Sequence, residues 1–600
     1  MKQITRFYQF LAKHVVQSRN VVVSIFGLSL IDQGFSIGSV YVWKEIIDKY
    51  LINVDDWTMR EFFIGMLSLV LVWQAMSFVS RLAKNRQYYK TRVLGDSISM
   101  AFMERGFTHV INLSMDFHES RSTGQVMRQL TKARDDLNNI ILAFFDKLVM
   151  QMISFVLVTI FFFYIQWQIA ILMLIFIPLF LLVTRHYAKN IDAIQQKIND
   201  DSEHSYDNVQ QALDGFTVVQ SYQTQNAETN RLHKNNHLAH QGLKGKTEAF
   251  QRLAFVQGSL VNFVRLAIIA AGGYYLFHGQ MTVGEVVLLS MWSYFIYNPM
   301  YEFSNLLAIF AEGMDSVDRV EQLLKVKSSI VNPKDGYKGQ KVAGLVSFNE
   351  VSFRYPAASN RGINNVSFDV PAGTKVAFVG PSGSGKTTLA KLLPRFYDVV
   401  GGSITLDGVD VRHWDIGALR NSIGMVQQDV ILFNDTIYNN IIYGRDKESL
   451  EQHDVNVKEQ LLEQVMEASK KAFAHDFIMS LPDGYDTVVG ERGVKLSGGE
   501  KQRIGIARTI LYDPPVLILD EATSALDSES EVMVMRALEK ISENRTTLTI
   551  AHRLSTIRHC DHILFCDNGE IVERGSHDSL MALGGRYHGY VELQKQKETV

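Results

Sequence analysis

The sequence predicts a membrane-spanning α-helical bundle in its first half and a soluble α/β domain in its second half. Nearly all of the long apolar runs lie in residues 1–325, whereas residues 346–600 have the mixed composition of a soluble protein. The chain has 600 residues, which is more than one hydrophobic core usually organises. A glycine-rich loop in the second half follows a short β-type run. We therefore expect two domains, residues 1–325 and 346–600, joined by a linker over 326–345.

Six apolar stretches in the first half are long enough to cross a bilayer. A helix rises ~1.5 Å per residue, so a hydrocarbon layer of ~30 Å needs about 20 apolar residues. Only a few residues around Gln166 separate the third stretch from the fourth, which predicts a tight hairpin there. We expect six transmembrane helices, over residues 21–43, 62–82, 139–165, 168–187, 253–277 and 285–311.

Two long polar intervals separate these stretches. Residues 83–138 and 188–252 contain no proline and are expected to be helical throughout. Each interval would measure at least ~80 Å as one helix, so it must extend from the membrane and turn back at its far end. We therefore expect the transmembrane helices to continue into long cytoplasmic extensions.

The distribution of basic residues predicts the orientation. Residues 81–138 carry ten Lys or Arg, whereas residues 166–168 and 278–284 carry none. Because basic loops stay on the cytoplasmic side, both termini are expected in the cytoplasm. Two cysteines, Cys560 and Cys566, give no disulfide framework and fit a reducing compartment. We expect an integral, multi-pass protein of the bacterial plasma (inner) membrane.

The glycine-rich loop has the pattern of a phosphate-binding loop between a strand and a helix. Its glycines let backbone N–H groups wrap phosphates, Lys386 meets the β and γ oxygens, and the Thr387 hydroxyl ligates Mg²⁺. The second half is therefore expected to be a soluble α/β P-loop NTPase domain that binds a nucleotide. The loop residues are Gly380, Pro381, Ser382, Gly383, Ser384, Gly385, Lys386, Thr387 and Thr388.

Two further segments complete the predicted nucleotide site. The apolar run 516–519 ends in Asp520 and Glu521. Asp520 is placed to hold Mg²⁺ through water, and Glu521 is placed to polarise the attacking water. Upstream, the turn formed by Ser497, Gly498, Gly499 and Glu500 opens a helix, which makes a second anion cradle.

The stretch Leu496–Arg503, with the sequence LSGGEKQR, resembles the signature of the ATP-binding-cassette (ABC) superfamily. The resemblance implies an ATP hydrolase coupled to transmembrane transport, with ATP and Mg²⁺ as cofactors. It assigns Glu521, His552 and Gln428 to catalysis, with Gln428 also reaching Mg²⁺. It also implies that Tyr355 stacks on adenine and that Asp527, in the loop 524–527, communicates between subunits.

The membrane half resembles the exporter branch of this superfamily, in which each chain is a half-transporter. Residues 117–124 and 214–222 resemble its two coupling helices. The resemblance implies that each ATP lies between the P-loop of one subunit and the Ser497–Glu500 turn of the other. No consensus position of the ATPase half is degraded, which favours a homodimer and leaves a heterodimer open.

Polar residues inside the predicted spans point to a substrate cavity. Tyr294, Asn298, Glu302 and Asn305 fall within an arc of about 80° on the sixth span. The stripe either lines the translocation pathway or bonds neighbouring helices. Two charged residues, Asp32 in span one and Arg265 in span five, either pair with each other or meet a charged substrate.

The expected cargo is a small amphiphilic compound, drug-like or lipid, exported from the cytoplasm or the inner leaflet. The formal net charge is −3, so no basic footprint for nucleic acid exists, and membrane lipids are the expected surroundings. Residues 432–445 and 493–503 also resemble exporters of glutathione conjugates or metal thiolates of the heavy-metal-tolerance type. That activity, and an ATP-gated channel or regulatory ABC protein, remain as alternatives.

Overall fold

The computed structural model describes residues 18–339, 341–355, 362–444, 455–520, 527–551 and 554–598. The chain divides into two compact units. Unit 1 comprises Met1–Ile111 and Gly124–Val326, and unit 2 comprises Asn112–Thr123 and Lys327–Val600.

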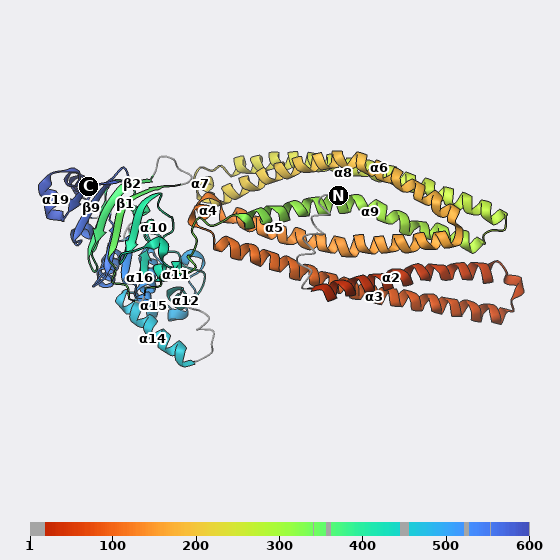
Figure 1. Ribbon diagram of the computed structural model, residues 1–600, viewed down its shortest axis with the longest axis horizontal. Helices are drawn as coiled ribbons and strands as arrows, with labels where there is room; N and C mark the ends of the chain where they lie inside the picture. The colour runs from red at the N-terminus through yellow and green to blue at the C-terminus, as the bar shows by residue number, and fades with distance from the viewer. Residues whose placement is uncertain are drawn as a thin grey trace. The chain divides into compact units, whose positions relative to one another are not determined.

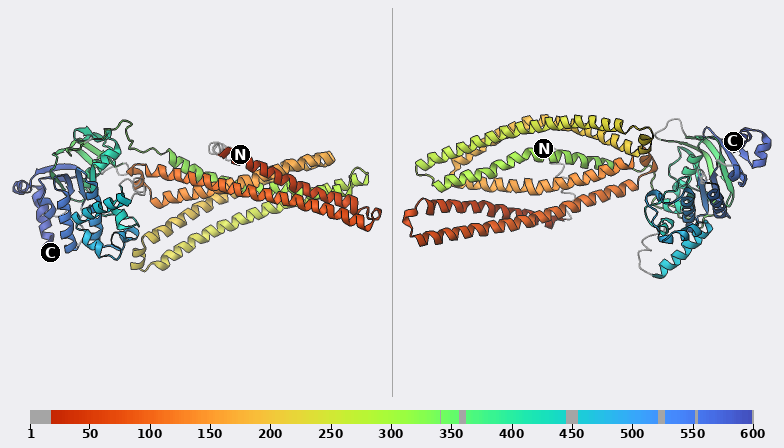
Figure 2. Two further views of the ribbon diagram at one scale, coloured as in Figure 1. Left: turned by 90° about the horizontal axis from the view of Figure 1, so that it is seen from below. Right: turned by 180° about the vertical axis from the view of Figure 1, so that it is seen from behind.

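Unit 1 consists of helices, several of them longer than 40 residues, and Figures 1 and 2 show them running lengthwise beside one another. A capping box starts the last helix: the Thr282 hydroxyl accepts from the N–H of Glu285, whose side chain accepts from the N–H of Thr282. The helices are α2 (Arg19–Ile46), η2 (Ile47–Leu51), η3 (Val54–Asp56), α3 (Met59–Ile111), α5 (Thr123–Leu142), η4 (Ala143–Val149), α6 (Met150–Asp214), α7 (Phe216–Ser221), α8 (Gln225–Phe277) and α9 (Val283–Lys325).

Four helical stretches among the described residues are long and apolar enough to cross a membrane. They are Arg19–Leu51, Met59–Ile111, Thr123–Tyr187 and Gln225–Phe277, and a shorter apolar helix covers Val283–Phe295. The third stretch contains two of the predicted spans. Gln166 leaves the helical conformation at φ −154° and ψ 98°, and the chain doubles back there in Figure 1, at the predicted hairpin.

Both polar intervals are helical, as predicted, and each contains a short helix where the chain changes direction (Figure 1). The first carries α4 (Met115–Ser120) between α3 and α5, and the second carries α7 between α6 and α8. Helix α7 lies within the second segment that resembles a coupling helix, 214–222, and α4 overlaps the first, 117–124. The prediction that both intervals are helical and turn back is therefore confirmed, and their place outside the membrane stays a prediction.

The buried centre of unit 1 is formed by side chains of α2, α6, α8 and α9, among them Ile37, Phe162, Ile268 and Trp292. Trp292 is 1% exposed, and its indole Nε1 donates to the carbonyl of Ile37 at 3.3 Å, so the largest buried side chain joins α9 to α2. Outside this centre α3 exposes many large apolar residues, as expected of helices that face lipid or a second subunit.

Unit 2 contains two β-sheets. An antiparallel sheet has the order β2-β1-β4-β5, and a six-stranded sheet has the order β10-β9-β3-β8-β7-β6. In the larger sheet every neighbouring pair is parallel except β10 with β9. The strands are β1 (Val346–Arg354), β2 (Gly362–Val370), β3 (Lys375–Val379), β4 (Gly401–Leu406), β5 (Val409–Asp410), β6 (Ile423–Val426), β7 (Val516–Asp520), β8 (Thr546–Ile550), β9 (His562–Asp567) and β10 (Glu570–Gly575).

The parallel strands explain where the predicted nucleotide site forms. All residues of β8 are buried, as expected of a strand covered on both faces. Because β3 and β7 are parallel neighbours of β8, the loop after β3 and the end of β7 share one edge of the sheet. The main helices of unit 2 are α10 (Lys386–Leu392), α11 (Ile416–Asn421), α12 (Ile437–Ile441), α14 (Val455–Lys471), α15 (His475–Ser480), α16 (Gly498–Tyr512), α17 (Ser528–Ile541), α18 (Leu554–Arg558), α19 (His577–Leu583) and α20 (Arg586–Glu598).

Candidate functional site

The loop between β3 and α10 has a backbone that requires glycine at two positions. Gly380 has φ 149° and Gly385 has φ 104°. A Cβ atom at Gly380 would lie 2.1 Å from the carbonyl oxygen of Cys566, and one at Gly385 would lie 2.6 Å from Cδ1 of Ile363. The predicted strand–loop–helix arrangement is therefore present, with its backbone packed closely against β2 and β9.

The polar groups of this loop suit a phosphate chain. Lys386 is 5% exposed, and its Nζ donates to the carbonyls of Gly380 and Pro381, both at 2.9 Å. Ser384 is 3% exposed, and its Oγ has no hydrogen-bond partner among the described residues. Thr387 is exposed in the first turn of α10. A cation, hydroxyls and the N-terminus of a helix are thus gathered in one loop.

The oxygen donors predicted for Mg²⁺ lie on neighbouring strands. Asp520 ends β7, and Gln428 follows β6, which pairs with β7. No cluster of three or more His, Cys, Asp or Glu that could hold a metal ion occurs among the described residues. Thr387, Asp520 and Gln428 offer only oxygen atoms to a cation, a donor set that fits Mg²⁺ when phosphate and water complete its coordination.

Helix α16 is tied to the loop that carries Gln428. The amide Nε2 of Gln502, which is 4% exposed, donates to the carbonyls of Gln427 at 3.1 Å and Gln428 at 2.5 Å. The backbone of this loop is therefore fixed from inside the domain. Its side chains at 427–429 are exposed, so they are accessible for contacts outside it.

Tyr355 lies beside the phosphate-binding loop. Its hydroxyl and that of Thr388 form a hydrogen bond of 3.2 Å. Its ring packs edge-to-face with Phe353, with centroids 4.9 Å apart, and with Tyr397, with centroids 5.4 Å apart. The aromatic predicted to stack on adenine is thus held next to α10 by two rings and one hydroxyl.

Ser497 and Glu500 form a capping box at the start of α16. Glu500 Oε2 accepts from the N–H of Ser497 at 2.7 Å and from its hydroxyl at 2.8 Å, while Ser497 Oγ accepts from the N–H of Glu500 at 3.3 Å. A Cβ atom at Gly499 would lie 2.5 Å from Cβ of Ser530. Ser497 and Gly498 are exposed at the N-terminal end of the 15-residue helix α16, so they are accessible to a second subunit.

Asp527 is exposed and caps α17. Its carboxylate accepts from the N–H of Ser530 at 3.0 Å, and this hydrogen bond holds the pKa of Asp527 below its ordinary value. The side chain therefore stays ionised near neutral pH. Glu521 and His552, the residues predicted to act on water and on the γ-phosphate, lie outside the described residues, as does the rest of the loop 521–526.

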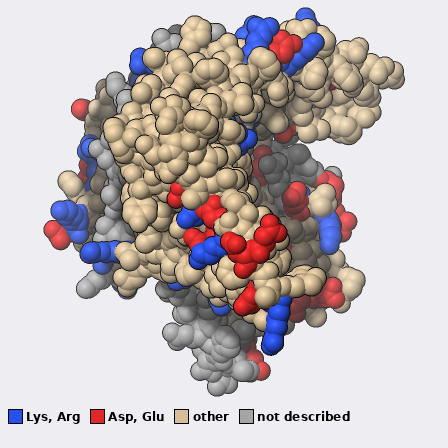
Figure 3. Space-filling view, turned by 90° about the vertical axis from the view of Figure 1, so that its right-hand side faces the viewer, with Lys and Arg blue, Asp and Glu red and all other residues tan. Residues whose placement is uncertain are grey.

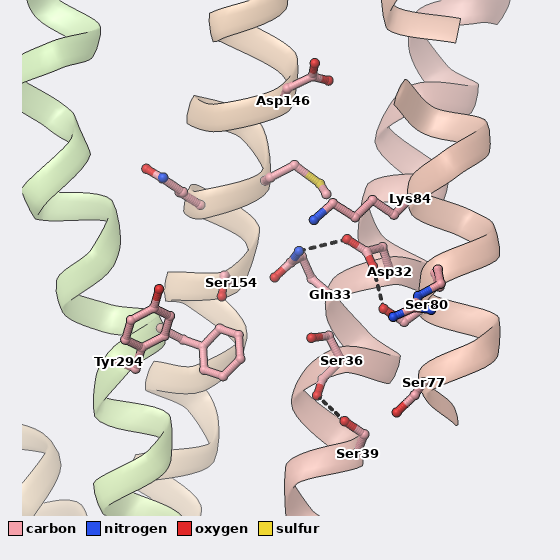
Figure 4. A pocket seen from close by; sticks show the side chains of 14 residues that line it. Asp32, Gln33, Ser36, Ser39, Ser77, Ser80, Lys84, Asp146, Ser154 and Tyr294 are labelled. Atoms are coloured by element: carbon pink, nitrogen blue, oxygen red, sulfur yellow. Dashed lines mark hydrogen bonds between the residues drawn. The ribbon is translucent and has the colours of Figure 1, made fainter. Parts of the chain in front are cut away.

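Unit 1 contains a polar cavity of about 490 Å³ between α2, α3, the η4–α6 segment and α9 (Figure 4). Two residues of the predicted substrate site, Asp32 and Tyr294, line it. Asp32 is 2% exposed and accepts hydrogen bonds from Ser80 Oγ at 2.6 Å and Gln33 Nε2 at 3.0 Å.

Asp32 and Arg265 do not pair within the described chain. The partners of Asp32 are Ser80 and Gln33, and Nε of Arg265 has no hydrogen-bond partner among the described residues. Arg265 is not among the residues that line the cavity. The side chains of Asn298, Glu302 and Asn305 lie outside the described residues, so the stripe on the sixth span stays a prediction.

The cavity also contains residues that the sequence reasoning missed. These are chiefly Arg81 and Lys84 of α3, Asp146 of η4 and Ser154 of α6. Asp146 interrupts the apolar stretch 139–165, and a carboxylate within a span is itself a sign of function. The sequence alone could therefore have identified Asp146 as a candidate, whereas a serine within a span gives no such indication for Ser154.

The chain matches known protein families over both units. The family described as "ABC transporter transmembrane region" matches residues 22–300, and the family described as "ABC transporter" matches residues 363–524. The ATP-dependent lipid A-core flippase of Pectobacterium atrosepticum is 33% identical over 562 residues, which cover 93% of this chain and 90% of that protein. The protein of the same name from Legionella pneumophila is 34% identical over 584 residues, which cover 94% of this chain and 93% of that protein.

A solved structure agrees with this assignment. A bacterial Atm1-family ABC exporter with ATP bound has a TM-score of 0.84 and 28% sequence identity, and the match covers 96% of this chain and 98% of that one. The phosphate-binding loop, the capped Ser-Gly-Gly turn and the helical membrane unit all occur in one chain. This chain therefore belongs to the ABC transporter family, as an ATP-hydrolysing exporter whose membrane domain is fused N-terminally to its ATPase domain.

Proposed function

We propose that this chain is one half of a dimeric exporter that moves an amphiphilic compound, a lipid or a drug-like molecule, out of the cytoplasm or the inner leaflet. The observation that carries the proposal is the cavity of unit 1, which is lined by charged and hydroxyl groups within helices that expose apolar residues. A polar cavity in an apolar surrounding suits a compound with one polar and one apolar part. The names of the flippase relatives also support a lipid.

The membrane domain of the proposal comprises residues 1–325 with six transmembrane helices, followed by a linker over 326–345 and the ATPase domain over 346–600. The protein would reside in the bacterial plasma membrane with both termini in the cytoplasm. The break at Gln166 supports counting the stretch Thr123–Tyr187 as two spans. The basic residues between 81 and 138 support the orientation.

In the proposed ATP site Lys386 binds the β and γ oxygens, the loop N–H groups surround them, and Tyr355 stacks on the adenine. Thr387, Asp520 and Gln428 would hold Mg²⁺, which supplies charge neutralisation at the phosphates. Glu521 polarises the attacking water, and His552 contacts the γ-phosphate. In hydrolysis the oxygen of this water forms a bond to the γ phosphorus while the bond from that phosphorus to the oxygen bridging the β and γ phosphates breaks, which gives ADP and inorganic phosphate.

The dimer completes each site in the proposal, because Ser497, Gly498 and Gly499 of one chain would face the P-loop of the other. Shifting the populations of two conformations, open and closed, from 99:1 to 1:99 requires that ATP bind the closed one ~5.5 kcal/mol more tightly. Several charge-assisted hydrogen bonds to the two γ-phosphates can supply this difference. Asp527, which is exposed at the start of α17, supports a contact across this interface. A homodimer is favoured.

A complementation experiment tests the composite site. Lys386→Ala and Ser497→Ala chains are each expected to be inactive in ATP hydrolysis as homodimers. A mixed dimer places one intact P-loop opposite one intact Ser-Gly-Gly turn, so it is expected to recover activity. If mixing under conditions of subunit exchange restores none, ATP is not bound between two chains.

A transport assay tests the cargo. Inverted vesicles with the wild-type chain are expected to accumulate a lipid analogue or an amphiphilic drug when ATP is present, and matched vesicles with Glu521→Gln are not. Stimulation of ATP hydrolysis by glutathione conjugates alone would replace the proposed cargo with that class. Downhill flux without sustained hydrolysis would instead indicate a channel.

A further inference from the structure

The cavity of unit 1 balances positive and negative charge. Its lining contains two carboxylates, Asp32 and Asp146, and two cations, Arg81 and Lys84. Its volume of about 490 Å³ lies within the ~300–1,000 Å³ typical of ligand pockets. Three of these groups, Asp32, Arg81 and Asp146, fall within the predicted spans, where charge is costly, so their presence around one cavity indicates a binding function.

Several donors of this cavity have no acceptor. Ser154 is 4% exposed, and its Oγ has no hydrogen-bond partner among the described residues. Arg81 and Lys84 make no hydrogen bond and no ion pair within 4 Å with any described residue. Figure 4 shows Lys84 extending from α3 across the cavity toward the helix that carries Asp146 and Ser154. This side of the cavity therefore offers cationic and hydroxyl donors to an anion.

The two carboxylates, Asp32 and Asp146, differ in how many further hydrogen bonds they are able to accept. Both oxygens of Asp32 are engaged, Oδ1 by Ser80 and Oδ2 by Gln33, so Asp32 orders the wall of the cavity. Asp146 lies in η4, a π-helix, a rare conformation that often marks functional sites. Its Oδ1 accepts from Gln87 Nε2 at 2.9 Å. An ionised carboxylate has about four acceptor positions, so Asp146 keeps capacity for a further donor.

We propose that this cavity binds a zwitterionic head group that carries both an amine and an anionic phosphate. Lys84 and Arg81 bind the phosphate, Ser154 donates to it, and Asp146 accepts from the amine. A group with only positive charge would leave the two cations unpaired, and a group with only negative charge would face two carboxylates. A neutral apolar group would leave the donors of Arg81, Lys84 and Ser154 without an acceptor, so the charge pattern itself selects the zwitterion.

This inference rests on the proposed function for its link to transport, but binding is measured without nucleotide and is therefore tested separately. Full-length protein in lipid nanodiscs is titrated with short-chain phosphatidylethanolamine, phosphatidylglycerol and a lipid whose head group carries only an amine. Wild type is expected to bind phosphatidylethanolamine about tenfold more tightly than either comparison lipid, a difference of ~1.4 kcal/mol, because each comparison lipid lacks one of the two charged groups.

Two variants separate the two charges. Asp146→Asn is expected to bind phosphatidylethanolamine and phosphatidylglycerol about equally. Lys84→Gln is expected to lose the advantage of phosphatidylethanolamine over the amine lipid. The matched control is Arg86→Gln, which removes an exposed cation of the same helix outside the cavity and is expected to keep both preferences. Lys84→Arg keeps the positive charge and is expected to keep both lipid preferences. This variant shows whether the loss in Lys84→Gln comes from the missing charge or from misfolding.

A soluble competitor distinguishes the source of the head group. Glycerophosphoethanolamine that displaces the lipid at similar concentration would support the head-group site with a soluble compound as its natural ligand. Failure of the soluble compound to compete, with the lipid preference intact, would support a lipid source. The proposal is overturned if wild type shows no preference for the zwitterion, or if both charge variants retain it.

Discussion

The carboxylate of Asp48 in η2 accepts a hydrogen bond from the backbone N–H of Gly284 in the first turn of α9, at 2.7 Å. Its second oxygen accepts from the Thr282 hydroxyl at 2.6 Å. A Cβ atom at Gly284 would lie 2.7 Å from this carboxylate, so glycine is needed for the approach. An anion at the start of α9 satisfies free N–H groups and complements the helix dipole.

This contact belongs to a charged cluster at the end of unit 1 where α2 leads into α3 and α8 into α9. Lys44 lies 3.9 Å from both Asp48 and Glu285, and Lys49 lies 2.8 Å from Glu45. Figure 3, which looks onto this end, shows acidic and basic side chains gathered beside each other. The cluster joins two helices that are far apart in the sequence.

Asp48→Ala is expected to destabilise unit 1. The change removes two hydrogen bonds to a charged group from a half-buried position, which costs about 2 kcal/mol. Thermal unfolding in detergent, followed by circular dichroism, measures the loss. Asp55→Ala is the control, because Asp55 is exposed on the same connection and has no side-chain partner among the described residues. An equal melting temperature for Asp48→Ala and wild type would contradict the role of this cap.

Gly380→Ala is expected to weaken ATP binding strongly. The added methyl group would lie 2.1 Å from the carbonyl of Cys566, so the phosphate-binding loop would have to leave β9. Binding of a fluorescent ATP analogue measures the effect, expected as at least a tenfold loss of affinity, ~1.4 kcal/mol. Gly408→Ala is the matched control. Gly408 also has a positive φ, 80°, but nothing lies within 4 Å of its added carbon.

The Gly408→Ala control carries only the ordinary cost of a left-handed alanine, ~1–2 kcal/mol, which affects stability rather than nucleotide affinity. Equal loss of ATP binding in both variants would show that backbone strain, and not the contact with β9, decides the result.

The ATPase half could be predicted from the sequence because its chemistry depends on local segments. The loop Gly380–Thr388 specifies its own strand–loop–helix setting, and Ser497 with Glu500 specifies a capping box three residues apart. The tight break at Gln166 followed in the same way from the short distance between two apolar stretches. In each case the partner residues are close in the chain.

The membrane cavity could not be predicted to the same degree, because it depends on which helix faces meet. Asp32 is bonded to Ser80, 48 residues away, and Asp146 to Gln87, 59 residues away. Periodicity gives the polar face of one helix but not the face of its neighbour. The π-helical segment Ala143–Val149 adds a local change of register, and this changes which side chains point into the cavity.

The two thiols are expected to be unreactive in the folded protein. Burial raises the pKa of Cys560 and of Cys566 to about 12, so both stay protonated at pH 8. The thiolate fraction is then about a thousandfold smaller than for an ordinary cysteine. Maleimide labelling followed by mass spectrometry tests this: the folded chain takes up no label in minutes, and the denatured chain takes up two. Rapid single labelling of the folded chain would contradict burial of one thiol.

The contact between Glu119 and Lys391 is expected to matter for coupling. Glu119 lies in α4, one of the segments that resemble coupling helices, and its Oε1 accepts from Nζ of Lys391 at 3.1 Å. Lys391 lies in α10, the helix that starts at the phosphate-binding loop. Met115 of α4 packs against the buried core of the same unit. We therefore expect a movement of α4 to be passed to the helix that follows the phosphate-binding loop.

Glu119→Lys is expected to lower substrate-stimulated ATP hydrolysis several-fold while thermal stability changes little, because a partly exposed ion pair contributes only ~0.2–1 kcal/mol. Lys391→Glu should have the same effect. The exchanged pair, Glu119→Lys with Lys391→Glu, restores opposite charges and is expected to recover stimulation, measured as the ratio of stimulated to basal hydrolysis in proteoliposomes. A double variant no better than either single one would show that the two residues act independently, and coupling would then depend on the apolar contact of α4 instead.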